Sequence, residues 1–541
     1  MEKRTILAIA LSLAVLLGFQ YLFPPAPKQQ QVVQPASVES SRTGNLENSE
    51  RDLSLNEPQV APAQLSESSR SSAQVLEKGK IVTIQNEVYR AEIDSLGGQL
   101  RAFYLKDYRT DLEADSLDLN LVTVTGHGPY PLSGAASING VWYKDSNLLF
   151  EISGEGLEID VISADTNFLL KAVLPSGETL IKEFIFQPQS YVLEVVYSFI
   201  DQEGTLHKAE AVNLNWSHTN APEEKKQYVY SGVVGFSEGK LYKPSKKDKN
   251  VSRQELMGPL NWLGYTSKYF ISAVLAPDEA SIARTKGLIE RADATNLMTG
   301  LQINQDNRLK VYIGPKKGVI LEALGMHLES AIEYGWFGII ARPLVQLLHF
   351  FNKYVHNYGL AIILLTILIK LAFYPLSQKS YKSMGKMKEV QPKLAKIKEK
   401  YKDDKARINK EMMDLYRTHK VNPFGGCLPI VVQIPVFFAL YRALMVAIEL
   451  RHAPFFGWIL DLSAKDPYYI TPLIMGATMF LQQKMTPTTG DAMQAKMMLF
   501  MPIIFTFMFL NFPAGLVLYW LVNNVLSIAQ QYMVMRQTAT S

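Results

Sequence analysis

The chain has 541 residues, of which 48% are hydrophobic and 20% charged, and its formal net charge is +4. At about 150 residues per domain, this length excludes a single small module. The one cysteine, Cys427, excludes an intrachain disulfide framework and a multi-cysteine metal site. No nucleotide-binding or metalloprotease motif is present, and the eight histidines lack metal-ligand spacing. We therefore expect no enzyme of a familiar motif-bearing class, no cofactor and no metal, and an unfamiliar hydrolase stays open as an alternative.

The first 80 residues predict a membrane anchor followed by a tether. Residues 1–5 include Lys3 and Arg4, and the apolar run at 6–23 is long enough to span a bilayer. A cleaved signal peptide is the alternative, but prolines follow the run directly and no small-residue cleavage site precedes them. Residues 24–80 lack Phe, Tyr and Trp, which predicts a disordered linker.

Residues 81–322 predict a large antiparallel β-domain. Short runs with alternating apolar residues are separated by Gly, Asp, Asn and Pro, which is typical of strands joined by turns. The clearest runs are Phe168 to Leu174, Tyr191 to Phe199 and Leu309 to Ile313. Residues 24–341 carry a net charge of −10, so the domain is acidic.

At 323–342 the apolar period becomes helical, and Trp336 is placed for a membrane interface. The pattern predicts an amphipathic interfacial helix. Packing of its apolar face against the β-domain is the alternative.

Five further hydrophobic segments follow, and with the anchor they predict six transmembrane helices. The second helix is expected within 343–376, and the third to sixth within 422–535. Residues 376–421 carry a net charge of +8, which predicts a cytoplasmic loop. Both chain ends, including the short tail at 536–541, are then cytoplasmic, and the β-domain is periplasmic.

The basic loop at 377–421 predicts an antiparallel helical hairpin. A coiled-coil spacing is followed by Met387, Val390, Leu394, Ile397 and Tyr401, and it is repeated by Ile408, Met412 and Leu415. The turn between the two runs lies at 402–405, where an aspartate can cap the second helix. The default interpretation of its lysines is that they lie on a solvated face and only mark the loop as cytoplasmic. Contact with nucleic acid or anionic lipid is the alternative.

Lys370 is the only charged residue between Tyr354 and Leu376. A central lysine costs about 2.5–3.5 kcal/mol on insertion scales, so it should face protein or a water-filled cavity. The other polar residues of the predicted spans could line such a cavity with it, namely Thr366, Gln433, Asn523, Asn524, Gln530 and Gln531. Two alternatives stay open: Lys370 could snorkel to the interface, and the other polar residues could simply join helices by hydrogen bonds.

Five stretches resemble the YidC, Oxa and Albino family of membrane insertases. They are TILIKLAFYPL at 366–376, KVNPFGGCLPIVVQIP at 420–435, DLSAKDPYY at 461–469, QKMTPT at 483–488 and FPAGLVLYW at 512–520. The resemblance implies a five-helix insertase core at about 340–535. The outer domain resembles, by layout, the β-supersandwich of Gram-negative members. The fold is thus expected to be a polytopic α-helical membrane protein with a large periplasmic antiparallel β-domain.

The family resemblance also implies a mechanism. In the family, a positively charged residue of the second span lies in a hydrophilic groove that opens to the cytoplasm and to lipid. Lys370 occupies that position, where arginine is usual, and Thr366 and Trp520 match positions that contact the entering chain. The implied function is insertion, folding and assembly of inner-membrane proteins.

The implied partners are nascent membrane proteins, the Sec translocon and the phospholipid bilayer. The ribosome is a further candidate only, because the tail after Arg536 has no basic cluster. Two other function classes remain as alternatives. One is a secondary transporter for a small anion, although the spans show no repeated halves. The other is a membrane-anchored, carbohydrate-binding periplasmic protein.

Overall fold

The computed structural model describes residues 79–113, 115–124, 129–153, 157–219, 229–245, 252–291, 296–401, 404–419, 421, 428–486 and 492–539. The predicted cytoplasmic N-terminus and anchor lie outside the described residues. So do the linker before Gly79, Cys427 and the last two residues of the predicted tail.

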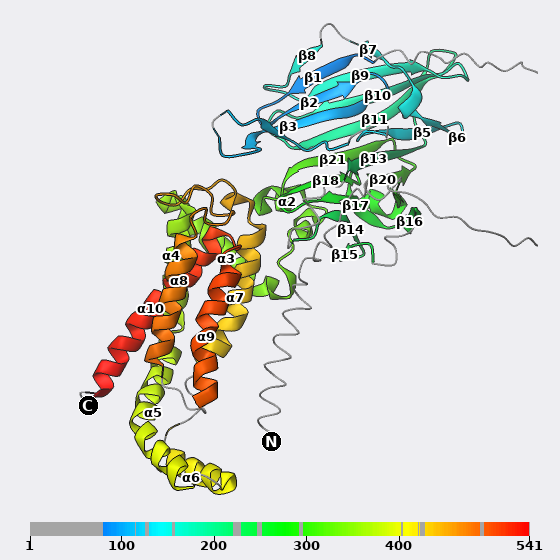
Figure 1. Ribbon diagram of the computed structural model, residues 1–541. Coiled ribbons are helices and arrows are strands. Elements are labelled where there is room, and N and C mark those ends of the chain that lie inside the picture. Colours follow the sequence, from blue (N-terminus) through cyan, green and yellow to red (C-terminus); the bar gives the residue numbers. More distant parts are fainter. Residues whose placement is uncertain are drawn as a thin grey trace, which may run out of the picture. The chain divides into compact units, whose positions relative to one another are not determined.

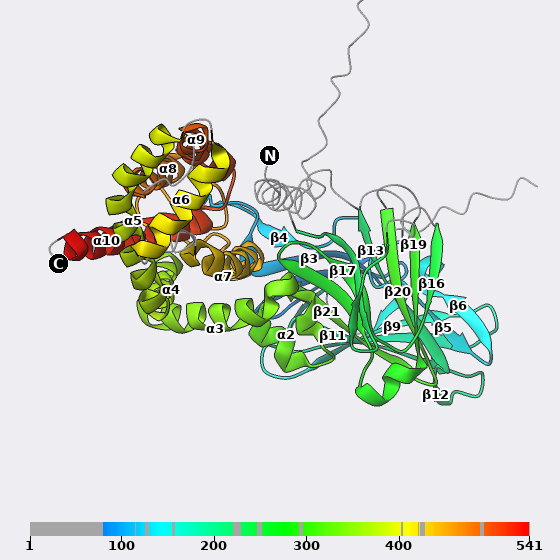
Figure 2. The same ribbon diagram turned by 90° about the horizontal axis from the view of Figure 1, so that it is seen from below.

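The first part of the described chain is a β-domain with three sheets (Figures 1 and 2). One sheet has the order β4 (Asp118–Asn120), β3 (Gln99–Arg109), β2 (Tyr89–Asp94), β1 (Ile81–Gln85) and β8 (Glu158–Asp160). The largest has the order β15 (Lys240–Tyr242), β14 (Gly232–Ser237), β17 (Leu260–Thr266), β18 (Phe270–Leu275), β21 (Arg308–Pro315), β11 (Val192–Ile200), β10 (Thr179–Phe186), β9 (Thr166–Val173) and β7 (Glu151–Ser153), and β12 (Leu206–Lys208) also pairs with β11. The third has the order β16 (Arg253–Met257), β19 (Thr285–Arg291), β20 (Asn296–Asn304), β13 (Ala211–Thr219), β5 (Gly134–Ile138) and β6 (Val141–Lys144).

The predicted strand faces are confirmed where the alternation was clearest. In β11, the apolar side chains of Leu193, Val195 and Tyr197 are all buried, and the same holds for the predicted faces of β9 and β21. Neighbouring strands of the described sheets are antiparallel, except that β1 and β8 run parallel. Large aromatic side chains such as Trp216 and Trp262 fill the core.

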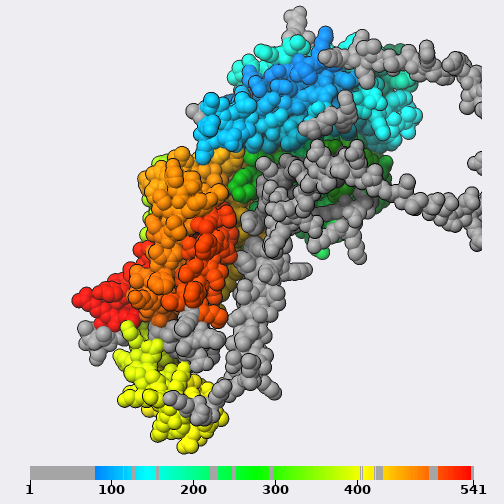
Figure 3. Space-filling model, viewed as in Figure 1, coloured from blue at the N-terminus to red at the C-terminus, as the bar shows by residue number. Residues whose placement is uncertain are grey.

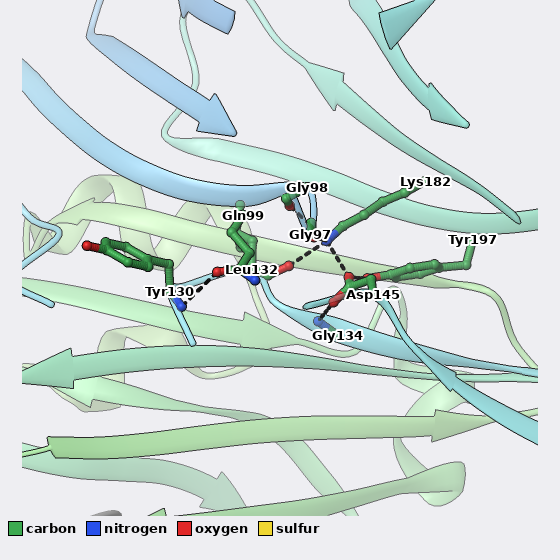
Figure 4. A network of polar contacts seen from close by, with 9 residues as sticks. All are labelled: Gly97, Gly98, Gln99, Tyr130, Leu132, Gly134, Asp145, Lys182 and Tyr197. Atoms are coloured by element: carbon green, nitrogen blue, oxygen red, sulfur yellow. Dashed lines mark hydrogen bonds and ion pairs between the residues drawn. The ribbon is translucent and has the colours of Figure 1, made fainter. Parts of the chain in front are cut away.

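A buried ionic network lies inside this domain (Figure 4). The Lys182 ammonium in β10 is 2.6 Å from the carboxylate of Asp145, and neither side chain is exposed to solvent. Lys182 also donates to the backbone carbonyls of Gly98 and Leu132 at 2.8 and 2.6 Å. Asp145 accepts further hydrogen bonds from the Tyr197 hydroxyl and from a backbone amide. Both buried charges therefore have polar partners, as low-dielectric burial requires.

The rest of the described chain is helical (Figure 1). The helices are α2 (Gly318–Leu324), α3 (Gly338–Val355), α4 (Tyr358–Ala372), α5 (Tyr374–Lys400), α6 (Lys405–Thr418), α7 (Leu428–Val446), α8 (Ile470–Met485), α9 (Ala492–Phe509) and α10 (Ala514–Ala539). The 3₁₀ turns in this part are η5 (Leu328–Ala331), η6 (Gly335–Phe337) and η8 (Ile448–Leu450), and the β-domain contains η1 (Asp145–Asn147) and η4 (Glu279–Arg284). Helix α10 packs against α4, α5 and α8, and α3 packs against α4 and α7.

Two helix predictions are wrong in their bounds. The continuous helix expected at 323–342 is replaced by the end of α2, the turns η5 and η6, and the start of α3. Gly325 and Gly335, both with positive φ, interrupt it. The span expected within 343–376 is divided among α3, α4 and α5, because His356 adopts the left-handed conformation that ends α3.

Length and composition alone do not assign six spans. Within the described residues, no single helix meets the criteria for a transmembrane span. One pair does so when taken together, namely α4 and α5, which are bent by 66° relative to each other. Shorter apolar helical stretches are found at Val431–Val446 and Met497–Phe509.

The basic hairpin is formed by α5 and α6, which project from the helical bundle (Figures 1 and 3). The predicted apolar seam is confirmed in part, since Met387, Val390 and Leu394 cluster with Met412 and Leu415. The other predicted seam residues, Ile397, Tyr401 and Ile408, do not belong to this cluster. Tyr416 and Val421 complete this cluster without having been predicted. As expected, an aspartate caps the second helix: the carboxylate of Asp404 accepts the Arg407 amide at 2.9 Å.

Candidate functional site: a polar network between α4, α7 and α10

Lys370 lies in the last turn of α4, and its half-buried side chain turns toward α10. Its ammonium donates to the Ser527 hydroxyl at 2.6 Å. Ser527 in turn donates to the backbone carbonyl of Asn523, one turn earlier in α10, at 2.7 Å. The lysine is therefore joined to the neighbouring helix by a hydroxyl rather than by a carboxylate.

A second contact extends this network to α7. The amide nitrogen of Gln433 donates to the side-chain oxygen of Asn523 at 2.8 Å and to the Tyr519 hydroxyl at 3.2 Å. Three helices thus meet through polar side chains in an otherwise apolar bundle. Within a membrane such groups are expected to bond to one another rather than to face lipid.

The charge on Lys370 lacks a carboxylate partner in the part of the chain that the structure describes. None of the ion pairs found there includes this lysine. The described residues also contain no group of His, Cys, Asp and Glu that could hold a metal ion. What the network offers is one ammonium group together with hydroxyl and amide groups, which suits transient contact with polar or acidic groups.

Two of the five predicted site residues lie outside the network. The Thr366 hydroxyl is buried and donates to the Ile362 carbonyl of its own helix at 2.6 Å. Trp520 packs edge-on against Phe437, with 4.6 Å between ring centroids, and also lies near Phe509. Its indole nitrogen has no hydrogen-bond partner among the described residues. The structure therefore brings together Lys370, Gln433 and Asn523, but not the other two.

Two residues of the network, Ser527 and Tyr519, were not predicted from the sequence. Each is four residues from Asn523, which places all three on one side of α10. Polar spacing along that helix was the signal that could have found Ser527. Other polar residues of α10 join helices instead: Asn524 contacts Thr478 of α8, and Gln530 contacts the Tyr374 carbonyl of α5.

Comparison with known proteins identifies the family. The model of the 60Kd inner membrane protein family matches residues 350–541, and that of the YidC periplasmic domain matches residues 81–347. A membrane protein insertase YidC from Geobacter metallireducens is 42% identical, with the alignment covering 100% of this chain and 99% of the relative. This chain belongs to the YidC family. The relative from Syntrophus aciditrophicus is 41% identical over 99% of this chain and all of its own length.

The YidC family consists of inner-membrane proteins named as insertases, not as enzymes, which agrees with the prediction that this chain is not an enzyme. The predicted periplasmic β-domain and helical C-terminal part are confirmed at this level by the two family matches. A crystal structure of an active YidC insertase covers 85% of this chain, at 18% identity and a TM-score of 0.39.

Proposed function

We propose that this chain inserts integral membrane proteins into the bacterial inner membrane and helps them fold and assemble, through the polar network around Lys370. The observation that carries the proposal is an ammonium group inside the helical bundle whose partner is a hydroxyl. A substrate's acidic or polar segment can replace that partner at little cost. The charge then lowers the free energy of bringing a carboxylate into a low-dielectric region.

The proposed topology has six spans, with cytoplasmic ends and basic hairpin and a periplasmic β-domain. The lysines and arginines of the basic hairpin support this orientation. The substrate's apolar segment partitions into lipid and supplies the driving force, so no nucleotide is required. We place Gln433 and Asn523 beside the path of the substrate's polar segment. Thr366 and Trp520 act by packing, and the Sec translocon is a partner for larger substrates.

The test is protease protection of a newly synthesised small membrane protein added to liposomes that contain the purified full chain. The chain is compared with Lys370→Ala and Lys370→Arg, and Lys484→Ala is the matched control because Lys484 is an exposed lysine in the last turn of α8. We expect protection with the unaltered chain, Lys370→Arg and Lys484→Ala, and its loss with Lys370→Ala.

A second substrate sharpens the experiment. When its acidic outer residues are replaced by serine, insertion should depend less on Lys370, because no carboxylate needs the charge. Equal insertion by Lys370→Ala and the unaltered chain with both substrates would remove Lys370 from the mechanism. Absence of insertion by every folded variant, together with saturable anion flux into the same liposomes, would instead favour the transporter.

A further inference from the structure

The segment between η8 and α8, residues 451–469, carries four large apolar side chains on its surface. Phe456 is 58% exposed, Trp458 38%, Leu460 57% and Tyr468 66%. All four lie within residues 453–469, and we call this part of the segment the cap. Soluble surfaces carry single apolar residues commonly, but a group of this size on one short segment indicates a binding surface.

The cap is rigidly attached to the bundle. Asn357 is the residue that precedes α4, and its side-chain amide donates to the backbone carbonyl of Phe455 at 3.2 Å. At the start of α10, the backbone amides of Gly515 and Ala514 donate to carbonyls of the cap at 2.9 and 2.7 Å. The ring of Phe455 lies so close to α4 that a Cβ on Gly359 would be 2.0 Å from it. The cap therefore covers the ends from which α4 and α10 begin (Figure 1).

Asp466 organises the inside of the cap. Its fully buried carboxylate accepts hydrogen bonds from the backbone amides of Tyr468 and Thr471 and from the Thr471 hydroxyl, at 3.0, 2.7 and 2.5 Å. The Trp458 indole nitrogen also donates to it at 3.1 Å. The polar edge of this indole thus has its partner inside the protein, which leaves the exposed part of the ring free for apolar contact.

The exposed tip is a tight turn. The Phe455 amide donates to the Ile459 carbonyl at 2.9 Å, and Gly457 between them has a φ of +61° with no atom near the position of a Cβ. A side chain at Gly457 would be strained by this φ, so the turn is built to present Phe456 and Trp458. In contrast to these exposed side chains, Leu462 of the cap is fully buried.

We propose that the cap is an interfacial anchor, which inserts Phe456, Trp458, Leu460 and Tyr468 into the headgroup region of the outer leaflet of a phospholipid bilayer. Tryptophan and tyrosine favour this region because they combine an apolar ring with a polar group. The surface is also continuous with exposed apolar residues of α8, including Leu473 and Ile474, which would face lipid in the proposed topology. The inference rests on the proposed function for this topology and adds an attachment point that fixes the depth of the bundle.

The test uses spin labels on the full chain in phosphatidylglycerol and phosphatidylethanolamine liposomes. Cys427→Ser removes the native thiol, and single cysteines are placed by Phe456→Cys, Tyr468→Cys, Leu473→Cys and Leu206→Cys. Leu206 is an exposed residue of β12 and serves as the aqueous control. Collisions with lipid-soluble oxygen are compared with collisions with a water-soluble nickel complex.

We expect oxygen to exceed the nickel complex at positions 456, 468 and 473, with the largest ratio at 473, and the reverse at 206. Water-like values at 456 and 468 together with a lipid-like value at 473 would overturn the anchor and leave the membrane topology intact. Water-like values at all three positions would overturn both the anchor and the proposed placement of α8 in the membrane.

Discussion

Two lysines, one in each half of the molecule, show two ways of keeping a charge inside a protein. Lys182 of the β-domain is fully buried, has a carboxylate partner in Asp145 and also bonds to backbone carbonyls. Lys370 of the helical part is half-buried and bonds to a single hydroxyl among the described residues. The charge of Lys182 is therefore fully satisfied by its partners, whereas the charge of Lys370 is available to a further acidic or polar group.

The partners of each lysine indicate whether its role is structural or functional. A buried ion pair whose donors and acceptors are matched holds the structure together, and a substrate could not reach it without unfolding the domain. A charge satisfied only by a neutral hydroxyl can exchange that partner for a substrate group. The comparison therefore separates a structural lysine from a candidate functional lysine, although both are inside the fold.

The largest effect on stability is expected for Lys182→Met. This change leaves Asp145 buried without its counter-ion, which typically costs about 3–5 kcal/mol. Hydrogen exchange of the β-domain in the full chain measures the loss, and Lys286→Met, at an exposed lysine of β19, is the control. Adding Asp145→Asn should restore part of the stability. Wild-type protection in Lys182→Met would refute the structural role of the ion pair.

A smaller effect on stability is expected for Asp466→Asn. This change tests whether the helical part also contains a buried charge whose hydrogen bonds hold the structure together. The amide group cannot accept all the hydrogen bonds that the carboxylate accepts, and a buried unsatisfied donor costs about 1–3 kcal/mol. Proteolysis of the cap should become faster. Asp461→Asn is the control, because Asp461 accepts one backbone amide within its own turn. Equal proteolysis rates for the two variants would contradict the prediction.

Lys316 extends the comparison within the β-domain, because it is a buried lysine whose partner is a hydroxyl. Lys316 is 4% exposed, and its ammonium donates to the Thr266 hydroxyl at 3.2 Å. Burial lowers the pKa of this ammonium to about 8. The folded state therefore binds fewer protons than the unfolded state between pH 8 and the ordinary lysine pKa. Stability should rise with pH in this window, by roughly 1 kcal/mol from pH 8 to 9. Denaturant unfolding at both pH values, compared with Lys316→Met, measures the difference. A pH dependence equal to that of the methionine variant would show that Lys316 does not carry it.

The smallest effect on stability is expected for Lys370→Met. Removing a charge with only a hydroxyl partner loses one hydrogen bond and relieves a desolvation penalty, so the net change should be within about 1 kcal/mol. Thermal unfolding in liposomes measures it beside the insertion assay. Loss of insertion with retained stability would sharpen the contrast with Lys182. A loss of several kcal/mol would make Lys370 a structural residue like Lys182.

Features that depend on local periodicity could be predicted from the amino-acid sequence alone. Alternation located the buried faces of β9, β11 and β21, and coiled-coil spacing located the seam between α5 and α6. The cost of a lysine in an apolar segment singled out Lys370 before any contact was known. Each of these signals is contained within a few neighbouring residues, which is why it can be recognised without the fold.

The contacts between distant groups depend on the tertiary structure. Ser527 is 157 residues from Lys370, and Asp145 is 37 residues from Lys182, so no local pattern connects them. The break between α3 and α4 also went unrecognised, because it depends on the left-handed conformation of His356 and on the contacts of Asn357 with the cap. Long-range partners are chosen by how helices and strands pack, and the sequence specifies that packing only through the whole chain.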